Sequence, residues 1–529
     1  METLKYDVLI IGYGVTGKLL ATLLGKQGWN VGVIDPYDTP YGLPRAVKYN
    51  DEVMRNLQSI MADEDVDRIS QSVPDHYTWV NADGETLLEL DWSQDGISGW
   101  PADTLFNHGE LEAAMDDART KIPNVDARLG FKVNYLDEDE DGVTVYARKT
   151  NNLGEFLPDG EKIKAFAPYV IGADGANSFI RSKMDNTIRD LGFASTFYVI
   201  DLIMKEERVF SPTNLQVADP KRPTTLAMAG PGRRRWEFML MPGETKEDFR
   251  DERTAWELLE PWDITSENAI IERHVVYTFN ARWVEDWRQG RLILAGDAAH
   301  LTPPFLGQGL SSGIRDASNL AWKLDLLLKG EVDESILDTY TEERQPHMQT
   351  LIEAAVHLGK IITVADEAKA KERDDALLSG TYPPLPDLPD LDHGILYKHG
   401  ENKLAGTLSL QAKVEYNNDV DRFDNLMGTG WKVIGLNNNP EESLDERQKE
   451  LLEKLDADYV SIASKDSDST DTVVDVEGKY EAYFKEHGIE AVVVRPDFYV
   501  YAGVHELTEL NEIISELESQ LPLKQTIKK

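Results

Sequence analysis

A G-x-G-x-x-G pattern at residues 12–17 has the spacing of a phosphate-binding turn. It follows a short apolar run, residues 5–11, and precedes leucines that recur at helical spacing. In such a turn the first glycine permits the sharp bend, the second lets the backbone approach a pyrophosphate, and the third lets the helix lie close to the strand. The helix N-terminus then offers free N–H groups to the phosphates. The pattern therefore predicts a dinucleotide site, and the residues expected there are Gly12, Gly14, Val15, Thr16 and Gly17.

Three aspartates stand at the ends of predicted strands. Asp35 ends residues 31–35, where a carboxylate can accept hydrogen bonds from the ribose hydroxyls of an adenosine. Asp174 and Asp297 end two further apolar runs, in a Gly-Ala-Asp-Gly and a Gly-Asp sequence that begin at Gly172 and Gly296. Asp297 is suited to bind the ribityl chain of FAD, and Asp174 is suited to hold nearby backbone amides in place. Together these segments favour FAD over a nicotinamide nucleotide as the tightly held ligand.

A loop rich in proline and glycine, residues 301–309, follows Asp297 and leads into a long predicted helix. Rigid residues and glycines let the backbone approach a flat ring closely. The helix N-terminus would then point at the pyrimidine edge of a flavin, where negative charge accumulates on reduction. The loop residues assigned to the flavin are Pro304, Gly307 and Gly309.

The elements that must position these residues fall into three regions. Apolar runs at 5–11, 31–35, 169–174 and 291–297 predict a buried parallel sheet, and 311–328 predicts a helix. Residues 75–100 and 190–285 alternate between apolar and polar side chains and predict an inserted antiparallel sheet. An acidic, proline-rich connector at 363–394 leads to an α/β unit with strands at 431–436, 459–463 and 491–495 and a helix at 479–487.

Composition excludes several functions. With 95 acidic and 55 basic residues the formal charge is −40, which repels nucleic acid and anionic membranes. We find no apolar run of about 18 residues that would span a membrane. The chain has no cysteine, so disulfides, Fe–S clusters and thiol chemistry are ruled out, the cytoplasm is the natural compartment, and no histidine pair predicts a metal site.

The three flavin segments and the Pro-Pro-x-x-Gly-Gln-Gly loop resemble the class A FAD-dependent aromatic hydroxylases, and most of all those that act on 3-(3-hydroxyphenyl)propionate. Residues 233–244, 276–282, 337–344 and 494–497 share the likeness. The resemblance implies an α/β fold with an FAD-binding Rossmann-like domain of the glutathione-reductase type, an inserted antiparallel-sheet substrate domain and a C-terminal thioredoxin-like domain. The expected ranges are 1–74, 101–189 and 286–362 for FAD, 75–100 and 190–285 for the substrate, 363–400 for a linker and 401–529 for the thioredoxin-like domain. Lacking Cys-x-x-Cys, that last domain would serve structure or subunit contacts, such as a homodimer.

The resemblance also assigns further flavin contacts. Arg45 corresponds to an arginine that reaches the pyrophosphate and ribityl region, and Leu310 and Ser311 to backbone contacts with the pyrimidine edge. Val133 corresponds to a backbone contact near the adenine. His108 stands where the family usually has a glutamine that contacts FAD, and an imidazole can still form a hydrogen bond there.

The implied reaction is hydroxylation of a phenol with NADH or NADPH and O2, by way of a flavin C4a-hydroperoxide, and 3-(3-hydroxyphenyl)propionate going to its 2,3-dihydroxy product is the first expectation. The residues considered for the substrate wall are Lys48, Tyr49, Phe238, Met239 and Phe305, and no residue could be assigned as the base that takes the phenolic proton. Another phenol, of the resorcinol or polyketide type, and a non-catalytic FAD-binding scaffold or sensor are the alternatives. No Trp-x-Trp-x-Ile-Pro segment of a flavin halogenase occurs.

Overall fold

A computed structural model describes residues 3–385, 388–399, 402–465 and 472–524. Its centre is a six-stranded sheet in the order β19-β20-β13-β2-β3-β9, in which every pairing is parallel except that of β19 with β20. The strands are β2 (Val8–Ile11), β3 (Val31–Asp35), β9 (Val125–Leu129), β13 (Tyr169–Gly172), β19 (Arg288–Gln289) and β20 (Leu292–Leu294). The residues of β2, β3, β13 and β20 are almost all buried, which explains why the sequence reads as continuous apolar runs.

Helices and two small sheets surround this centre. The helices are α1 (Val15–Lys26), α2 (Asp51–Gln58), α3 (Asp63–Ile69), α4 (His108–Thr120), α6 (Gly309–Lys329) and α7 (Asp338–Ile362). A four-stranded sheet contains β1 (Thr3–Lys5), β12 (Lys162–Ala167), β11 (Val143–Lys149) and β10 (Phe131–Glu138). A three-stranded sheet contains β4 (Lys48–Asn50), β8 (Asp103–Phe106) and β5 (Ser70–Ser72).

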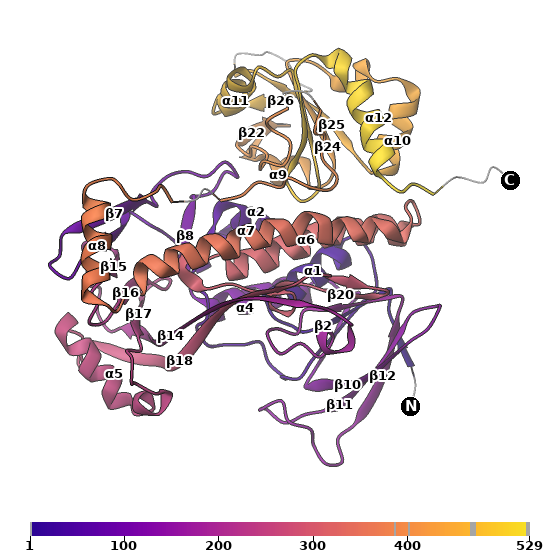
Figure 1. The fold of residues 1–529 in the computed structure, drawn as a ribbon. Coiled ribbons are helices and arrows are strands. Elements are labelled where there is room, and N and C mark those ends of the chain that lie inside the picture. The colour runs from indigo at the N-terminus through magenta and orange to yellow at the C-terminus, as the bar shows by residue number, and fades with distance from the viewer. Residues whose placement is uncertain (1–2, 386–387, 400–401, 466–471, 525–529) are drawn as a thin grey trace.

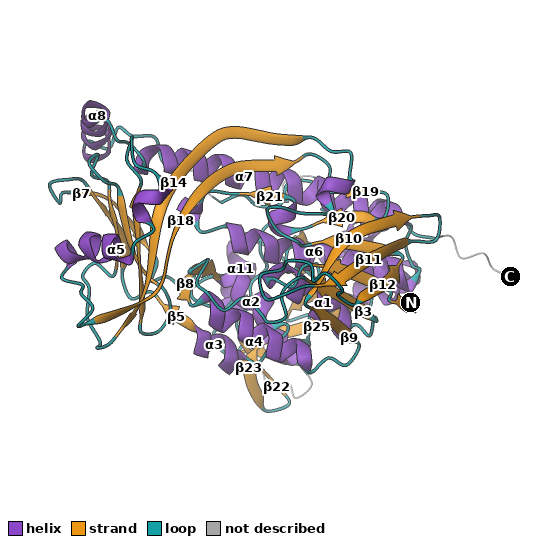
Figure 2. Cartoon of the chain, turned by 90° about the horizontal axis from the view of Figure 1, so that it is seen from below, coloured by secondary structure: helices purple, strands orange, loops and turns teal. Residues whose placement is uncertain are grey.

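The predicted second layer is an eight-stranded sheet in the order β21-β18-β14-β17-β16-β15-β6-β7. Its strands are β6 (His76–Val80), β7 (Thr86–Asp91), β14 (Ile188–Met204), β15 (Asn214–Val217), β16 (Thr224–Met228), β17 (Arg233–Met239), β18 (Ala269–Val284) and β21 (His300–Leu301). Figure 2 shows the long strands β14 and β18 arching from this sheet back towards the nucleotide-binding layer. The helix α5 (Glu252–Leu259) covers one face of the sheet, and the end of α7 covers part of the other.

The C-terminal unit lies on the opposite side of α6 from the central six-stranded sheet (Figure 1). Its sheet has the order β23-β22-β26-β25-β24-β27-β28, and β27 runs antiparallel to β24. The strands are β22 (Lys413–Tyr416), β23 (Asp419–Arg422), β24 (Lys432–Leu436), β25 (Asp458–Ala463), β26 (Val473–Asp475), β27 (Ala491–Val494) and β28 (Val500–Val504). The helices are α9 (Phe423–Met427), α10 (Glu446–Lys454), α11 (Lys479–His487) and α12 (Leu510–Gln520). The β24-α10-β25 and α11-β27-β28-α12 units agree with the predicted thioredoxin-like fold.

The connector differs from its prediction. The acidic stretch expected to be an extended linker contains the helix α8 (Glu367–Leu378), which Asp366 caps by accepting a hydrogen bond from the Lys369 amide. The helix forms because its residues have good helix propensity and carry an N-cap, whereas the net acidity had favoured an extended reading. Residues 386–387 and 400 of the predicted linker, and 401, 466–471 and 525–529 of the predicted C-terminal domain, lie outside the described residues.

Candidate functional site

The glycine turn between β2 and α1 has the geometry that its spacing predicts. Gly12 has a φ of +110°, and a Cβ there would lie 2.2 Å from the carbonyl oxygen of Ala173. A Cβ at Gly17 would lie 2.2 Å from the carbonyl oxygen of Gly12, so only glycine lets helix and strand approach this closely. Gly14 is exposed, and a Cβ there would meet nothing within 4 Å. The open face of the turn therefore lies at Gly14, where a pyrophosphate would approach.

Asp35 holds this turn in place from the end of β3. Its carboxylate accepts hydrogen bonds from the amides of Tyr13, at 2.8 Å, and Tyr37, at 2.9 Å. Burial raises the pKa of Asp35, and the two amide hydrogen bonds act against that rise. The residue thus organises the glycine turn, a role that the ribose assignment alone did not predict.

Asp174 plays the indirect part expected of it. Its carboxylate accepts hydrogen bonds from the hydroxyl of Ser178 and from the amides of Phe179, at 2.7 Å, and Ile180, at 3.2 Å. The residue before it, Ala173, lies against the first glycine of the turn. Asp174 therefore shapes the loop that meets the glycine turn, and its part in FAD binding stays a prediction.

Thr16 joins the glycine turn to the third predicted segment. A Cβ at Gly296 would lie 2.8 Å from the Thr16 hydroxyl oxygen, and a Cβ at Gly313 would clash with the same atom. Gly313 lies in the second turn of α6, so α1, α6 and the loop after β20 approach each other here. Segments far apart in the sequence thus meet at the carboxyl end of the parallel sheet, where ligands bind in such folds.

Asp297 lies beside two other predicted flavin contacts. Its side chain is reached by solvent although protein surrounds it on most sides, and it makes no hydrogen bond within the described chain. Burial raises the pKa of Asp297, while the neighbouring His300, Arg45 and His108 act in the opposite direction. Asp297 therefore lies within electrostatic range of Arg45 and His108, and its carboxylate is available to a ribityl chain.

Arg45 and His108 both contact Tyr41. The Arg45 guanidinium lies 4.0 Å from the centre of the Tyr41 ring, and the His108 and Tyr41 rings meet edge to face at 6.1 Å. His108 is buried, and its Nε2 lies 3.4 Å from Glu112 Oε1. Its Nδ1 is buried with no hydrogen-bond partner in the described chain, which is the condition expected of a group that binds a ligand.

Val133 lies apart from these residues. Its side chain is buried within β10, so only its backbone is available for the predicted contact near the adenine. The β10–β11 register shifts directly after Val133, which interrupts the regular pairing at this point. Its assignment to FAD stays a prediction.

The proline- and glycine-rich loop ends at the N-terminus of α6. Residues Pro304–Leu306 form a 3-10 turn that ends at Gly307, whose φ is +66°. A Cβ at Gly307 would lie 3.2 Å from Cδ of Lys48, so β4 meets the loop here. Gly309 and Leu310 open the helix, and the buried hydroxyl of Ser311 has no hydrogen-bond partner in the described chain. The free N–H groups of a 21-residue helix and an unsatisfied hydroxyl suit the predicted flavin edge.

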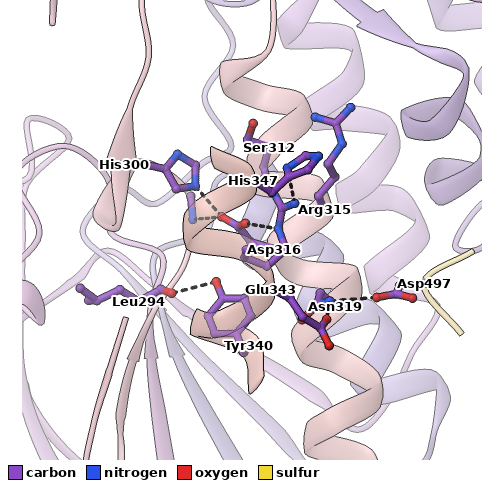
Figure 3. A network of polar contacts seen from close by, with 12 residues as sticks. Leu294, His300, Ser312, Arg315, Asp316, Asn319, Tyr340, Glu343, His347 and Asp497 are labelled. Atoms are coloured by element: carbon purple, nitrogen blue, oxygen red, sulfur yellow. Dashed lines mark hydrogen bonds and ion pairs between the residues drawn. The ribbon is translucent and has the colours of Figure 1, made fainter. Parts of the chain in front are cut away.

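A buried polar network, which no sequence pattern had predicted, lies behind the loop and holds it in place (Figure 3). Asp316 of α6 accepts hydrogen bonds from the amide of Gly296, at 2.9 Å, and from Arg344 Nε, at 3.0 Å, and its Oδ2 lies 2.7 Å from His300 Nε2. All four residues are buried. Asp316 thus fixes the backbone directly before Asp297. The segment 337–344, noted above for its family likeness, contained the signal, because it ends in Arg344.

The same network extends into the C-terminal unit. Arg495 pairs with Glu343 at 2.6 Å and with Asp497 at 2.7 Å, and all three side chains are at most 1% exposed. Lys323 lies 2.9 Å from the same Glu343 oxygen. Burial alone would raise the pKa of Glu343, but Arg495 and Lys323 lower it to about 2. The family-like segments 337–344 and 494–497 are therefore the two sides of one interface.

The residues considered for the substrate wall divide into two groups. Phe305 packs edge to face on Phe197 of β14, and Met239 is the register partner of Phe197, so both lie on the sheet face that meets the loop. Lys48 pairs with Asp103 at 2.5 Å beside that loop. These three keep their place as predicted substrate neighbours.

The other two face away from the loop. Phe238 alternates with Met239 along β17 and packs on the face covered by α5. Tyr49 is fully buried, stacks on Phe106 with ring centres 4.3 Å apart and binds the Ser70 hydroxyl. Phe238 differs from its prediction because side chains alternate between the two faces of a strand, and Tyr49 differs because it occupies a core position. We leave both residues out of the proposed wall.

Two further findings limit the kinds of site that the described residues can form. None of the helices in the described chain is long and apolar enough to cross a membrane. Within the described residues no group of three or more histidine, aspartate or glutamate side chains is arranged to hold a metal ion.

Comparisons with known proteins point to one class. Residues 5–355 match the family described as "FAD binding domain", and residues 406–520 match the one described as "HcaD C-terminal domain". A probable NADH-specific resorcinol 4-hydroxylase of Rhodococcus jostii (strain RHA1) is 34% identical over 515 residues, which are 97% of this chain and 94% of the relative. A 3-(3-hydroxy-phenyl)propionate/3-hydroxycinnamic acid hydroxylase of Escherichia coli (strain K12) is 29% identical over 539 residues, covering 98% and 95%.

Among solved structures, the flavin-dependent monooxygenase PieE in complex with FAD and substrate superposes with a TM-score of 0.79 at 18% identity. The match covers 98% of this chain and all of that one. At this identity the likeness concerns the fold, and it extends over the nucleotide-binding layer, the eight-stranded sheet and the C-terminal unit alike.

Proposed function

Since the chain belongs to the FAD-binding family of class A aromatic hydroxylases, we propose that it hydroxylates a small phenol of the resorcinol type with NADH as electron donor. The chain is an FAD-dependent aromatic monooxygenase. The resorcinol enzyme shares more identity with it than the hydroxyphenylpropionate enzymes do, 34% against 29%, so we place resorcinol ahead of our first expectation.

The observation that carries the proposal is the meeting of three segments at the carboxyl end of the parallel sheet, opposite one face of the eight-stranded sheet. We assign the pyrophosphate to Gly14 and the N-terminus of α1, the ribityl chain to Asp297 and the flavin edge to the N-terminus of α6. FAD, when bound, supplies the oxygen-activating chemistry that no side chain can provide. The protein orients the phenol and excludes water, and we keep residues 75–100 and 190–285 as the proposed substrate domain.

A second candidate is 3-(3-hydroxyphenyl)propionate, which Arg273 favours. This arginine of β18 donates hydrogen bonds to the carbonyl oxygen of Pro44 and to the hydroxyl of Tyr277, but it has no carboxylate partner in the described chain. A guanidinium in that condition can bind the propionate group. Substitution of Arg273 by glutamine would then raise KM for the propionate substrate and leave KM for resorcinol unchanged.

The test measures NADH and NADPH oxidation by the FAD-loaded protein with resorcinol, 3-(3-hydroxyphenyl)propionate and larger polycyclic phenols, followed by mass analysis of the products. We expect resorcinol to stimulate oxidation and to yield a trihydroxybenzene. A 2,3-dihydroxy product from the propionate alone would establish the second candidate. If FAD is bound and no phenol stimulates oxidation, the chain is a scaffold or sensor and the proposal is wrong.

The compartment and the assembly stay proposals as well. The absence of cysteine suits the reducing cytoplasm. Light scattering on the purified protein would test whether the chain forms a homodimer.

A further inference from the structure

Glu237 stands on the sheet face that meets the flavin loop. It lies between Trp236 and Phe238, which point to the opposite face under α5. In register it is level with Thr225 of β16 and Val199 of β14, and the neighbouring Phe197 packs on Phe305 of the loop. Strand alternation therefore directs the Glu237 carboxylate to the side of the sheet on which we propose that the phenol binds.

The carboxylate is poorly paired. Its only ionic partner in the described chain is Arg235, at 3.5 Å, a distance beyond that of a good hydrogen bond. Arg235 is held elsewhere, because its Nε donates to Asp201 at 2.7 Å and its Nη1 donates to the carbonyl oxygen of Arg45 at 2.6 Å. The guanidinium thus ties the sheet to the predicted flavin-binding segment and leaves Glu237 able to accept another proton donor.

The charged and titratable groups around Glu237 come from three strands. They are Arg235 on its own strand, Asp201 on β14 and Tyr77 on β6, whose hydroxyl donates to Gln216 at 3.2 Å. Burial raises the pKa of Glu237, Arg235 lowers it and Asp201 raises it. A carboxylate whose pKa lies above its usual range is a stronger base for a phenol than an exposed one.

The other carboxylates near the loop are less suitable. Asp201 is 2% exposed, so a substrate cannot reach it, whereas Glu237 is 14% exposed. Asp103 is paired with Lys48 at 2.5 Å. Asp297 lies at the other side of the loop, at the end of the parallel sheet, where we place the ribityl chain.

We propose that Glu237 accepts the proton of the phenolic hydroxyl group during hydroxylation, and that Arg235, anchored by Asp201, is the positioning residue that orients it. This inference rests on the proposed function. The O–H bond of the phenol breaks, its electron pair stays on the phenolate oxygen, and the proton forms a new bond to a carboxylate oxygen of Glu237. No oxidant is consumed in the step. The negative charge of the phenolate makes the ring electron-rich. The ring is then a good nucleophile for the oxygen that the cofactor would supply.

The experiment compares the wild-type protein with Glu237→Gln and with a control, Glu272→Gln, over pH 6 to 10. Glu272 is a carboxylate of the same sheet with a similar exposure of 19%. It pairs with Arg233 at 3.4 Å, and this pair lies away from the loop. Product formed per NADH consumed, and the rate of product formation, are measured with resorcinol. We expect Glu237→Gln to lose about 100-fold or more in product formation near pH 7. The loss should shrink above about pH 9, where the phenol ionises in solution, and Glu272→Gln should follow the wild type.

Two results would overturn the inference. One is a Glu237→Gln protein that keeps the wild-type rate and pH profile, and the other is an equal loss in Glu272→Gln. If Glu237→Gln fails to bind FAD, the wild type is assayed with phenols of graded acidity instead. A midpoint of the kcat profile that stays constant across the series supports an enzyme base, and one that follows the acidity of each phenol refutes it. A wild-type protein that no phenol stimulates refutes the proposed function itself, so the two failures are distinguishable.

Discussion

Arg495 offers the sharpest test of the buried network between the C-terminal unit and the FAD-binding layer. Its side chain is fully buried and donates to Glu343 at 2.6 Å, to Asp497 at 2.7 and 3.0 Å and to the carbonyl oxygen of Ile395 at 2.9 Å. Arg495→Met keeps the aliphatic volume and removes the charge. Two carboxylates then remain in a buried interface without their main partner.

The size of the stability loss depends on the partners that Glu343 and Asp497 keep. Removing one partner of a buried ion pair costs about 3–5 kcal/mol. Glu343 retains Lys323 at 2.9 Å, and Asp497 retains a hydrogen bond from Asn319 at 2.9 Å. We therefore expect the lower end, a loss of about 3 kcal/mol in the free energy of unfolding. With a urea dependence of about 3 kcal/mol per M, the midpoint of the transition would fall by about 1 M.

The assay is urea unfolding followed by tryptophan fluorescence, which reports on this interface because Trp322 and Trp431 meet edge to face there at 5.6 Å. Arg447→Met is the matched control, since Arg447 lies in the same unit, is 73% exposed and pairs with Glu518 at 2.8 Å. Adding Glu343→Gln to Arg495→Met should cost less than the sum of the two single changes. A loss for Arg495→Met no larger than that of the control would refute the view that these charges are buried and interdependent.

Three further predictions concern the cofactor and acid stability. Gly14→Ala should leave the fold intact, because a Cβ there meets nothing within 4 Å. It should nevertheless lower FAD affinity by at least about 10-fold. An unchanged affinity in a flavin-fluorescence titration would contradict the pyrophosphate assignment. His108→Gln should keep FAD affinity within about 3-fold, whereas His108→Leu should lose about 10-fold, the worth of one hydrogen bond to the unpartnered Nδ1. The pKa of Glu343 is lowered to about 2, below its unfolded value of about 4.3, so its stabilising contribution is complete above the unfolded value and is lost as the pH falls towards 2. The urea midpoint should accordingly fall further between pH 6 and pH 3 in the wild type than in Glu343→Gln. Equal falls in the two proteins would show that Glu343 is not held ionised.

Local patterns predicted most of the nucleotide-binding layer, because its chemistry depends on short-range spacing. A buried parallel strand must read as an apolar run, and a turn that approaches a pyrophosphate must carry glycine at 12, 14 and 17. The same reasoning located Asp35, Asp174 and Asp297 at strand ends. The absence of cysteine excluded dithiol chemistry in the C-terminal unit before its fold was known. The roles of the flavin-site residues remain predictions until a ligand is observed.

Other features depended on which residues meet across the fold. Strand alternation could be read from the sequence, but not which face of β17 would lie against α5, and this decided that Phe238 is core while Glu237 faces the loop. The partners Glu343 and Arg495 are separated by 152 positions in the chain, and Asp316 and Arg344 by 28. Charge compensation of this kind is set by distances in space, because the Coulomb energy and the desolvation cost depend on burial and separation rather than on position in the chain. The sequence by itself therefore determined the glycine turn, the strand-end aspartates and the class of enzyme. The tertiary structure alone decided which carboxylate faces the proposed substrate and how the C-terminal unit is joined to the nucleotide-binding layer.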